Sequence, residues 1–182
     1  MNLIVAPSQT VGPFFHIGFD RLYVNDLTAP GVVGERVTIG GKIIDGDGKP
    51  VSDAVIEVWQ ADAKGQYANT ANAAFTGYGR IATDEYGAFS FVTFKPGRVA
   101  GNDGDLQAPH IAVSVFMRGL LKRLVTRIYF ADEASNIDDA VLNMVPPERR
   151  ATLMAKKNAA DTAKLEWHII LQGDRETVFF DC

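Results

Sequence analysis

The residues of this sequence best suited to acid–base or metal chemistry are its three histidines, His16, His110 and His168. His168 faces away from Trp167 in an alternating apolar segment, which predicts a surface or interface position. His16 lies in an aromatic cluster, where a structural role is favoured. His110 directly follows Pro109 at the start of a predicted strand, although a structural role stays open for it too. Residues this scattered indicate no Ser/His/Asp or Cys/His arrangement.

A second candidate is the acidic segment 45–49, Asp-Gly-Asp-Gly-Lys, which superficially resembles a calcium loop. The calcium pattern requires a further acid two residues before Asp45, where Ile43 stands, and a glutamate at its end. Neither is present. The segment is therefore predicted to be a hairpin turn in which the glycines take positive φ angles.

The composition is that of an ordinary globular protein. The chain has 182 residues, 47% of them hydrophobic and 22% charged, with a formal net charge of −4 and a pI of about 5.3. This length fits one domain, or one domain with a terminal extension. Since no basic patch or basic helix is visible, nucleic acid and membrane surfaces are not expected as partners.

The chain termini show no sign of export or of disulfide chemistry. The single cysteine, Cys182, is the last residue and has no partner for an internal disulfide. The start, Met1 to Pro7, has neither the basic residues nor the long apolar core of a signal peptide. No apolar run approaches the ~18 residues of a membrane span. A cytoplasmic location is the expectation.

The elements that must position these residues are mostly strands. Residues 1–35 form an N-terminal arm rich in Pro and Gly, too interrupted for regular structure, whose Phe14-Phe15-His16-Ile17-Gly18-Phe19 cluster is expected to pack on the domain or on a partner. Residues 36–182 are expected to form the domain itself, with one short helix at 147–157. Apolar residues alternate in the segments 37–43, 54–60, 89–93, 111–116, 124–130, 165–171 and 177–180. The predicted fold class is all-β, an antiparallel β-sandwich.

Several of these segments together resemble a known family. Glu57-Val58-Trp59-Gln60-Ala61-Asp62 leads into a loop ending at Tyr67, as in the intradiol ring-cleaving dioxygenases. Further blocks follow in register over most of the chain: Thr83-Asp84 with 87–91, Lys95-Pro96-Gly97, Pro109-His110-Ile111 and 124–130. The opening 7–15 and the closing 177–181 resemble, within this family, the iron-less chain of enzymes built from two kinds of chain.

The resemblance implies a chemistry that this chain does not carry in full. The family uses iron(III), Fe(III), held by two tyrosines and two histidines, to activate a catechol for attack by oxygen. Tyr67 and His110 match one ligand of each type, whereas Val99 and Ala112 stand at the other two positions. Gln107 replaces an arginine that the catalytic chains carry. The resemblance thus implies a vestigial site, with no metal bound and no catalytic residue in this chain.

The resemblance places the function of the chain at an interface with a catalytic beta-type subunit of the same dioxygenase, which would hold the iron. Thr10, Gly12 and Pro13 match arm residues that close the partner's pocket, and Arg118 matches an arginine close to it. Its guanidinium would attract an aromatic dihydroxy acid substrate. The alternatives are that the arm residues only anchor the arm and that Arg118 forms an ordinary interface salt bridge.

Two further functions stay open at this point. One is a self-sufficient dioxygenase with an unusual ligand set, which Val99 and Ala112 disfavour. The other is a non-enzymatic β-sandwich that serves as a scaffold or binding module. The sequence fixes neither the copy number of an assembly nor, without the resemblance, the substrate.

Overall fold

The computed structural model describes residues 5–70, 73–101, 104–161 and 163–181. The expectation for Cys182 and part of that for the N-terminus therefore lie outside the described residues. The helical elements are α1 (Pro13–Ile17), η1 (Ala134–Asp138), α2 (Ala140–Asn143) and η2 (Arg150–Leu153). The strands are β1 (Arg36–Ile44), β2 (Val55–Gln60), β3 (Tyr78–Ala82), β4 (Ala88–Phe94), β5 (Val99–Ala100), β6 (Leu106–Gln107), β7 (His110–Phe116), β8 (Leu124–Phe130), β9 (Met154–Lys157), β10 (Lys164–Glu166) and β11 (Ile169–Ile170).

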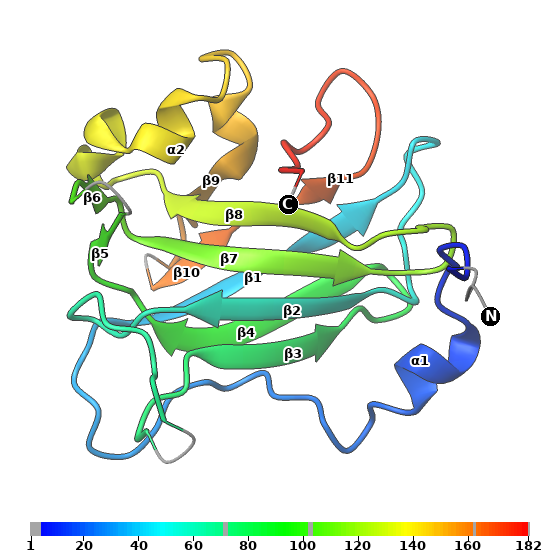
Figure 1. Cartoon of the computed structure of the whole chain (residues 1–182), viewed down its shortest axis with the longest axis horizontal. Coiled ribbons are helices and arrows are strands. Elements are labelled where there is room, and N and C mark those ends of the chain that lie inside the picture. The colour runs from blue at the N-terminus through cyan, green and yellow to red at the C-terminus, as the bar shows by residue number, and fades with distance from the viewer. Residues whose placement is uncertain (1–4, 71–72, 102–103, 162, 182) are drawn as a thin grey trace.

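Nine of these strands belong to one hydrogen-bonded sheet, in the order β11-β1-β10-β9-β8-β7-β2-β3, with β4 paired to β1. Figure 1 shows β2, β3, β7 and β8 in one layer, in front of β1, β4 and β10. The all-β class is therefore confirmed. The purely antiparallel pairing is wrong, because β1 pairs in parallel with β10 and β11, and β8 pairs in parallel with β9.

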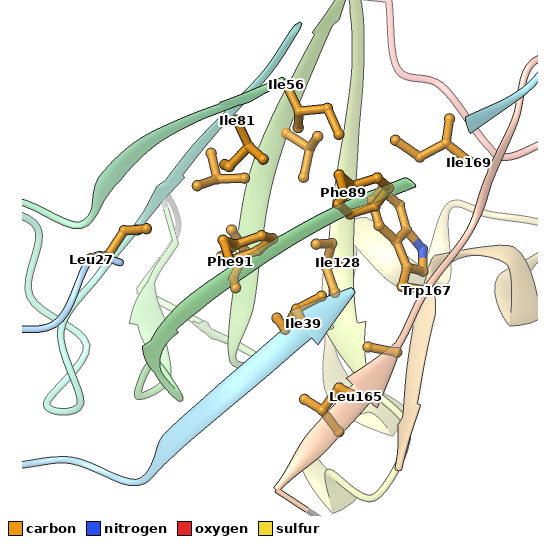
Figure 2. Packing of buried hydrophobic residues seen from close by; sticks show 14 of the residues in the cluster. Leu27, Ile39, Ile56, Ile81, Phe89, Phe91, Ile128, Leu165, Trp167 and Ile169 are labelled. Carbon is orange, nitrogen blue, oxygen red and sulfur yellow. The ribbon is translucent and has the colours of Figure 1, made fainter. Parts of the chain in front are cut away.

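The core lies between the two layers, as the alternating patterns require. Ile39 of β1 and Phe91 of β4 come from one layer, and Ile56 of β2 and Ile128 of β8 come from the other. Figure 2 shows these four side chains converging in one cluster, and all are almost fully buried. Leu27 of the arm is part of the same cluster, so the arm contributes to the core of its own chain.

The predicted helix at 147–157 is wrong. The segment instead forms η2, followed directly by β9. β9 lies between β8 and β10, with Ala155 opposite Phe130 and Lys157 opposite Leu165. Pairing on both sides overrides the helical end signals in the sequence, because a strand at this position completes the path between the two layers.

The short helices lie elsewhere. α1 occupies the arm, where no regular structure was expected, and begins at Pro13, whose fixed φ suits a first helical position. α2 is capped by Asp139, whose side chain accepts a hydrogen bond from the Leu142 backbone N–H. Among the described residues no helix is long and apolar enough to cross a membrane.

Other boundaries also differ from the expectation. The predicted strand 165–171 is split into β10 and β11, because the Trp167 backbone N–H donates to Gly40 O and the following His168 ring accepts from the Lys42 N–H. Strands β3, β5 and β6 were not predicted. The segment 177–180 forms only a single bridge, Phe180 to Val125.

The turn at 45–49 is confirmed. The Asp45 carboxylate accepts hydrogen bonds from the backbone N–H groups of Asp47 and Lys49, and Gly48 has a φ of 79°. The Asp45 side chain thus stabilises the turn through backbone hydrogen bonds, which gives it a structural role other than binding calcium.

Candidate functional site

The structure brings the five positions of the expected vestigial site together at one end of β7. Val99 pairs with Gln107 across β5 and β6, and Ala112 of β7 lies beside Trp59 of β2. The Trp59 ring in turn stacks on the Tyr67 ring, with 4.4 Å between their centroids. The loop that carries Tyr67 is therefore held on the sheet by an aromatic pair.

His110 is buried at the start of β7, and its Nδ1 lies 2.8 Å from the Ala108 carbonyl oxygen. A carbonyl oxygen only accepts, so Nδ1 carries the proton and Nε2 keeps a free lone pair. Burial, followed by the nearby Arg127 charge, lowers the pKa of His110 below its usual 6.5. The imidazole is thus neutral at pH 7, with the tautomer that a metal ligand would need.

Tyr67 is half-buried in its loop. Burial raises its pKa, while the Arg127 charge lowers it by a smaller amount. The phenol is therefore protonated at neutral pH. A tyrosinate ligand would have to lose this proton.

Arg127 lies at the centre of these positions, on β8 directly opposite Ala112. Its Nη1 donates to Gln107 Oε1 at 2.8 Å and to the Tyr129 hydroxyl at 3.3 Å. Its charge also lowers the pKa of both Tyr67 and His110. A cation of the protein itself thus lies beside Gln107 and Ala112, two of the five positions.

The network continues into the protein through a buried carboxylate. The Tyr129 hydroxyl donates to Asp139 Oδ1 at 3.2 Å, and the Ala108 backbone N–H donates to Asp139 Oδ2 at 2.7 Å. Burial is the largest influence on Tyr129 and raises its pKa to about 12. Sequence reasoning missed Arg127 and Asp139 as members of this site. Arg127 was visible in the block 124–130, but its cross-strand neighbours depend on register.

The residues at this place do not fit iron(III). Tyr67 and His110 are two donors, whereas Val99 and Ala112 offer no donor atom. Within the described part of the chain, no group of three or more His, Cys, Asp or Glu side chains is arranged to hold a metal.

The other expected residues come together at the opposite end of β7. A cavity of about 250 Å³ is lined by Gly12 and Pro13 of the arm, by Asp53 and by Arg118. The Gly119 backbone N–H donates to Thr10 Oγ1 at 2.7 Å, which fixes the arm to the loop after β7. The four arm-site residues expected from the sequence are therefore neighbours, and Asp53 is an addition that the sequence did not reveal.

Arg118 forms an ion pair with Asp53, from its Nε to the carboxylate, and its side chain is 66% exposed. A Cβ added at Gly12 would meet no atom of this chain within 4 Å. The space around Gly12 is therefore open from within the chain. We will call the surface formed by Thr10, Gly12, Pro13, Asp53 and Arg118 the arm pocket.

The two places are well separated. The seven residues of β7 span roughly 20 Å at about 3.3 Å per residue, with the vestigial site at its start and the arm pocket beyond its end. Of the remaining histidines, His16 lines the cavity of the arm pocket, whereas His168 lies at neither place. His168 is exposed and its Nε2 lies 3.0 Å from Glu166, which confirms its surface position. The His16 backbone O accepts from the Tyr23 hydroxyl and so helps to shape the arm.

The fold is that of a dioxygenase domain. The dioxygenase domain of a dioxygenase–carbohydrate-binding fusion from Streptomyces sp. SirexAA-E superposes with a TM-score of 0.67, covering 86% of this chain and 89% of that domain. At 24% identity this likeness concerns the fold alone.

Sequence relatives carry the comparison further. The protocatechuate 3,4-dioxygenase alpha chain of Burkholderia cepacia is 44% identical over 97% of this chain and 96% of its own length. The protocatechuate 3,4-dioxygenase beta chain of the same organism is 31% identical over 93% of this chain and 76% of its own length. The family model described as Dioxygenase matches residues 20–173. The chain belongs to this dioxygenase family, the intradiol ring-cleaving enzymes that its motifs predict.

Proposed function

We propose that this chain is the alpha subunit of a protocatechuate 3,4-dioxygenase. The complex cleaves 3,4-dihydroxybenzoate with O2 to 3-carboxy-cis,cis-muconate in the catabolism of aromatic compounds. In this proposal the beta subunit holds Fe(III) and performs the oxygen chemistry, whereas the present chain, on a β-sandwich, shapes the pocket of its partner. Relatives of both chain types support the pairing.

One observation supports the proposal that the beta subunit, and not this chain, holds the iron. The family's metal neighbourhood in this chain contains the Arg127 guanidinium, bonded to Gln107 and Tyr129, and two of the four ligand positions have no donor atom. The two remaining donors, Tyr67 and His110, would bind iron(III) only weakly, so we assign the metal to the beta subunit.

The arm pocket supports the second half of the proposal. An exposed guanidinium beside a compact Gly-Pro step suits the carboxylate of an aromatic acid, directly or through a water molecule. Around it the arm exposes large apolar side chains, Phe14, Ile17 and Leu22. Grouped exposed apolar residues are typical of a surface that a partner covers. We therefore assign the arm to the contact with the beta subunit, in the cytoplasm.

The scaffold function remains the second candidate, because a fold without a metal site also suits a binding module. The two are separated by expressing the full chain alone and together with a beta-type chain. We expect the chain alone to contain less than about one-tenth of an iron per chain, by metal analysis, and to consume no oxygen with protocatechuate. The co-expressed pair should elute together, bind iron and consume oxygen.

Stoichiometric iron and ring cleavage by the chain alone would overturn the proposed division of labour. A chain that stays monomeric and inert beside a beta-type chain would favour the scaffold function instead.

A further inference from the structure

A cavity of about 380 Å³ lies beside the vestigial site and shares Gln107 with it. It is lined by Arg127 and Gln107, by Leu106, and by Ala140, Val141 and Met144 around α2. This volume is within the range of roughly 300–1,000 Å³ in which proteins bind small molecules. The cavity is therefore large enough for a small organic ligand.

The positive charge in the wall of this cavity is the guanidinium of Arg127. Arg127 uses Nη1 for both hydrogen bonds that it makes within the described ranges, to Gln107 and to Tyr129. These two bonds fix the plane of the guanidinium. Within the same ranges its other nitrogens, Nη2 and Nε, make no hydrogen bond, and Arg127 lines the cavity, so they can offer it the planar fork that matches a carboxylate. Asp105, near the opening, is the acidic residue among the lining side chains.

The rest of the wall is apolar. Leu106 and Met144 are exposed, although both are large hydrophobic residues, and they line the cavity together with the exposed Ala140 and the partly buried Val141. Apolar side chains exposed at the opening of a cavity gain free energy when an apolar ligand covers them. The methionine side chain also adapts readily to the shape of what it contacts.

We infer that this cavity binds a small carboxylic acid with an apolar body, its carboxylate on Arg127 and its body against Leu106, Val141 and Met144. The proposed role of the cavity is binding, since its described lining combines one guanidinium with mostly apolar side chains. The inference does not depend on the subunit role proposed above, since every residue that it uses belongs to this chain.

The test is a titration of the full chain with 4-fluorobenzoate, followed by fluorine NMR. We expect a saturable shift with a Kd on the order of 1 mM or tighter, which corresponds to about 4 kcal/mol. The neutral analogue 4-fluorobenzamide should bind at least about tenfold more weakly, because it forms no charge-assisted pair. Absence of saturation up to about ten times that concentration would overturn the inference.

Two arginine variants locate the ligand. Arg127→Gln should weaken 4-fluorobenzoate binding at least about tenfold, whereas Arg123→Gln, at an exposed arginine in the loop between β7 and β8, should leave it unchanged. The reverse pattern would place the ligand outside this cavity and refute the inference. Equal small effects of both variants would indicate non-specific attraction of an anion and would refute it as well.

A third variant covers the case in which Arg127→Gln fails to fold. Met144 is 74% exposed, so Met144→Trp changes no buried packing. The larger side chain should obstruct the opening and weaken binding by about tenfold or more. Unchanged affinity in a folded Met144→Trp protein would be evidence against this cavity.

Discussion

At the scale of single residues, Gln107 at the vestigial site contacts Arg127, and the set of metal ligands is incomplete. His110 keeps the backbone hydrogen bond and the tautomer that would suit a ligand, yet its neighbour is now a guanidinium. Gln107 stands where the catalytic chains of the family carry a cation, and here its amide oxygen accepts from one. The positive charge of this chain therefore lies on β8, whereas the resemblance implies one at position 107 of β6 in the catalytic chains.

The first residue-scale prediction concerns His110→Gln and pH. Burial and Arg127 hold the pKa of His110 below 6.5, so the unfolded chain takes up a proton at a higher pH than the folded chain does. The neutral imidazole therefore contributes its full stability above about pH 6.5, and stability is lost as pH falls below that value, by at most about 1.4 kcal/mol per pH unit.

The measurement is the free energy of unfolding in urea at about pH 8 and pH 5.5 for both proteins. The advantage of the native chain over His110→Gln should shrink at the lower pH. An advantage that stays constant, or that grows on acidification, would contradict a depressed pKa.

The second residue-scale prediction concerns Arg118→Gln in the complex with the beta subunit. Removal of one exposed charge near a substrate carboxylate should raise KM for protocatechuate by roughly three- to tenfold, with little change in kcat. The iron content should remain unchanged. Steady-state oxygen uptake and metal analysis measure the two quantities.

Arg123→Gln is the matched control, because Arg123 is also exposed and lies in the same loop between β7 and β8. It should leave KM unchanged. Loss of iron in Arg118→Gln would show that the ion pair with Asp53 maintains the interface, and the assignment to substrate would be wrong.

At the scale of elements, β1 shows how tightly the two ends of the chain are joined. Its neighbours on one side are β10 and β11, and the break between them lies directly beside Gly41. A Cβ on Gly41 would overlap the Trp167 carbonyl oxygen. A Cβ on the adjacent Gly40 would lie 3.4 Å from the nearest atom, which is an ordinary contact.

We therefore expect Gly41→Ala to lower the free energy of unfolding by about 3 kcal/mol, because two backbones would have to separate. Gly40→Ala should change it by less than about 1 kcal/mol. Urea titrations of the two variants measure the difference, and equal effects would mean that β1 and the Trp167 segment can move apart at little cost.

The same element shows what the sequence could and could not reveal. Strands with one face in the core, such as β1, β4 and β7, show alternating apolar and polar residues. Their predicted bounds therefore agree with the structure within a few residues. β9 was mistaken for a helix because its identity is set by its neighbours β8 and β10, and not by its own four residues. β3 was missed because its small and charged residues carry little periodic signal.

At the scale of the whole molecule, the sequence motifs predicted residues of two sites, one at each end of β7. The structure adds the side chains that contact these residues. The resemblance named the vestigial positions and the four residues of the arm pocket. Arg127, Asp139 and Asp53 could not be found in this way, because their roles depend on register and on contacts between distant segments.

The prediction at this scale concerns assembly. Phe14 is 79% exposed on the arm, and its replacement by Ser should weaken association with the beta subunit by about tenfold or more while leaving the chain folded. Analytical ultracentrifugation of the mixed chains measures this effect. Ile137→Ser is the control, since Ile137 is as exposed but lies in η1, away from the arm. Equal losses in both variants, or none in Phe14→Ser, would remove the arm from the interface.

Because β1 pairs in parallel with β10 and β11, the sheet around β1 can be completed only late in translation. Lys42 and His168, which are joined by a hydrogen bond, are 126 residues apart in the chain. At about 5–20 residues per second, the ribosome needs roughly 6–25 s to make this stretch. Until then one edge of β1 has no partner, and an unpaired edge is prone to join strands of other chains. The arm emerges first, but β1, whose residues share a core cluster with Leu27 of the arm, has all its partner strands only after translation has passed β11.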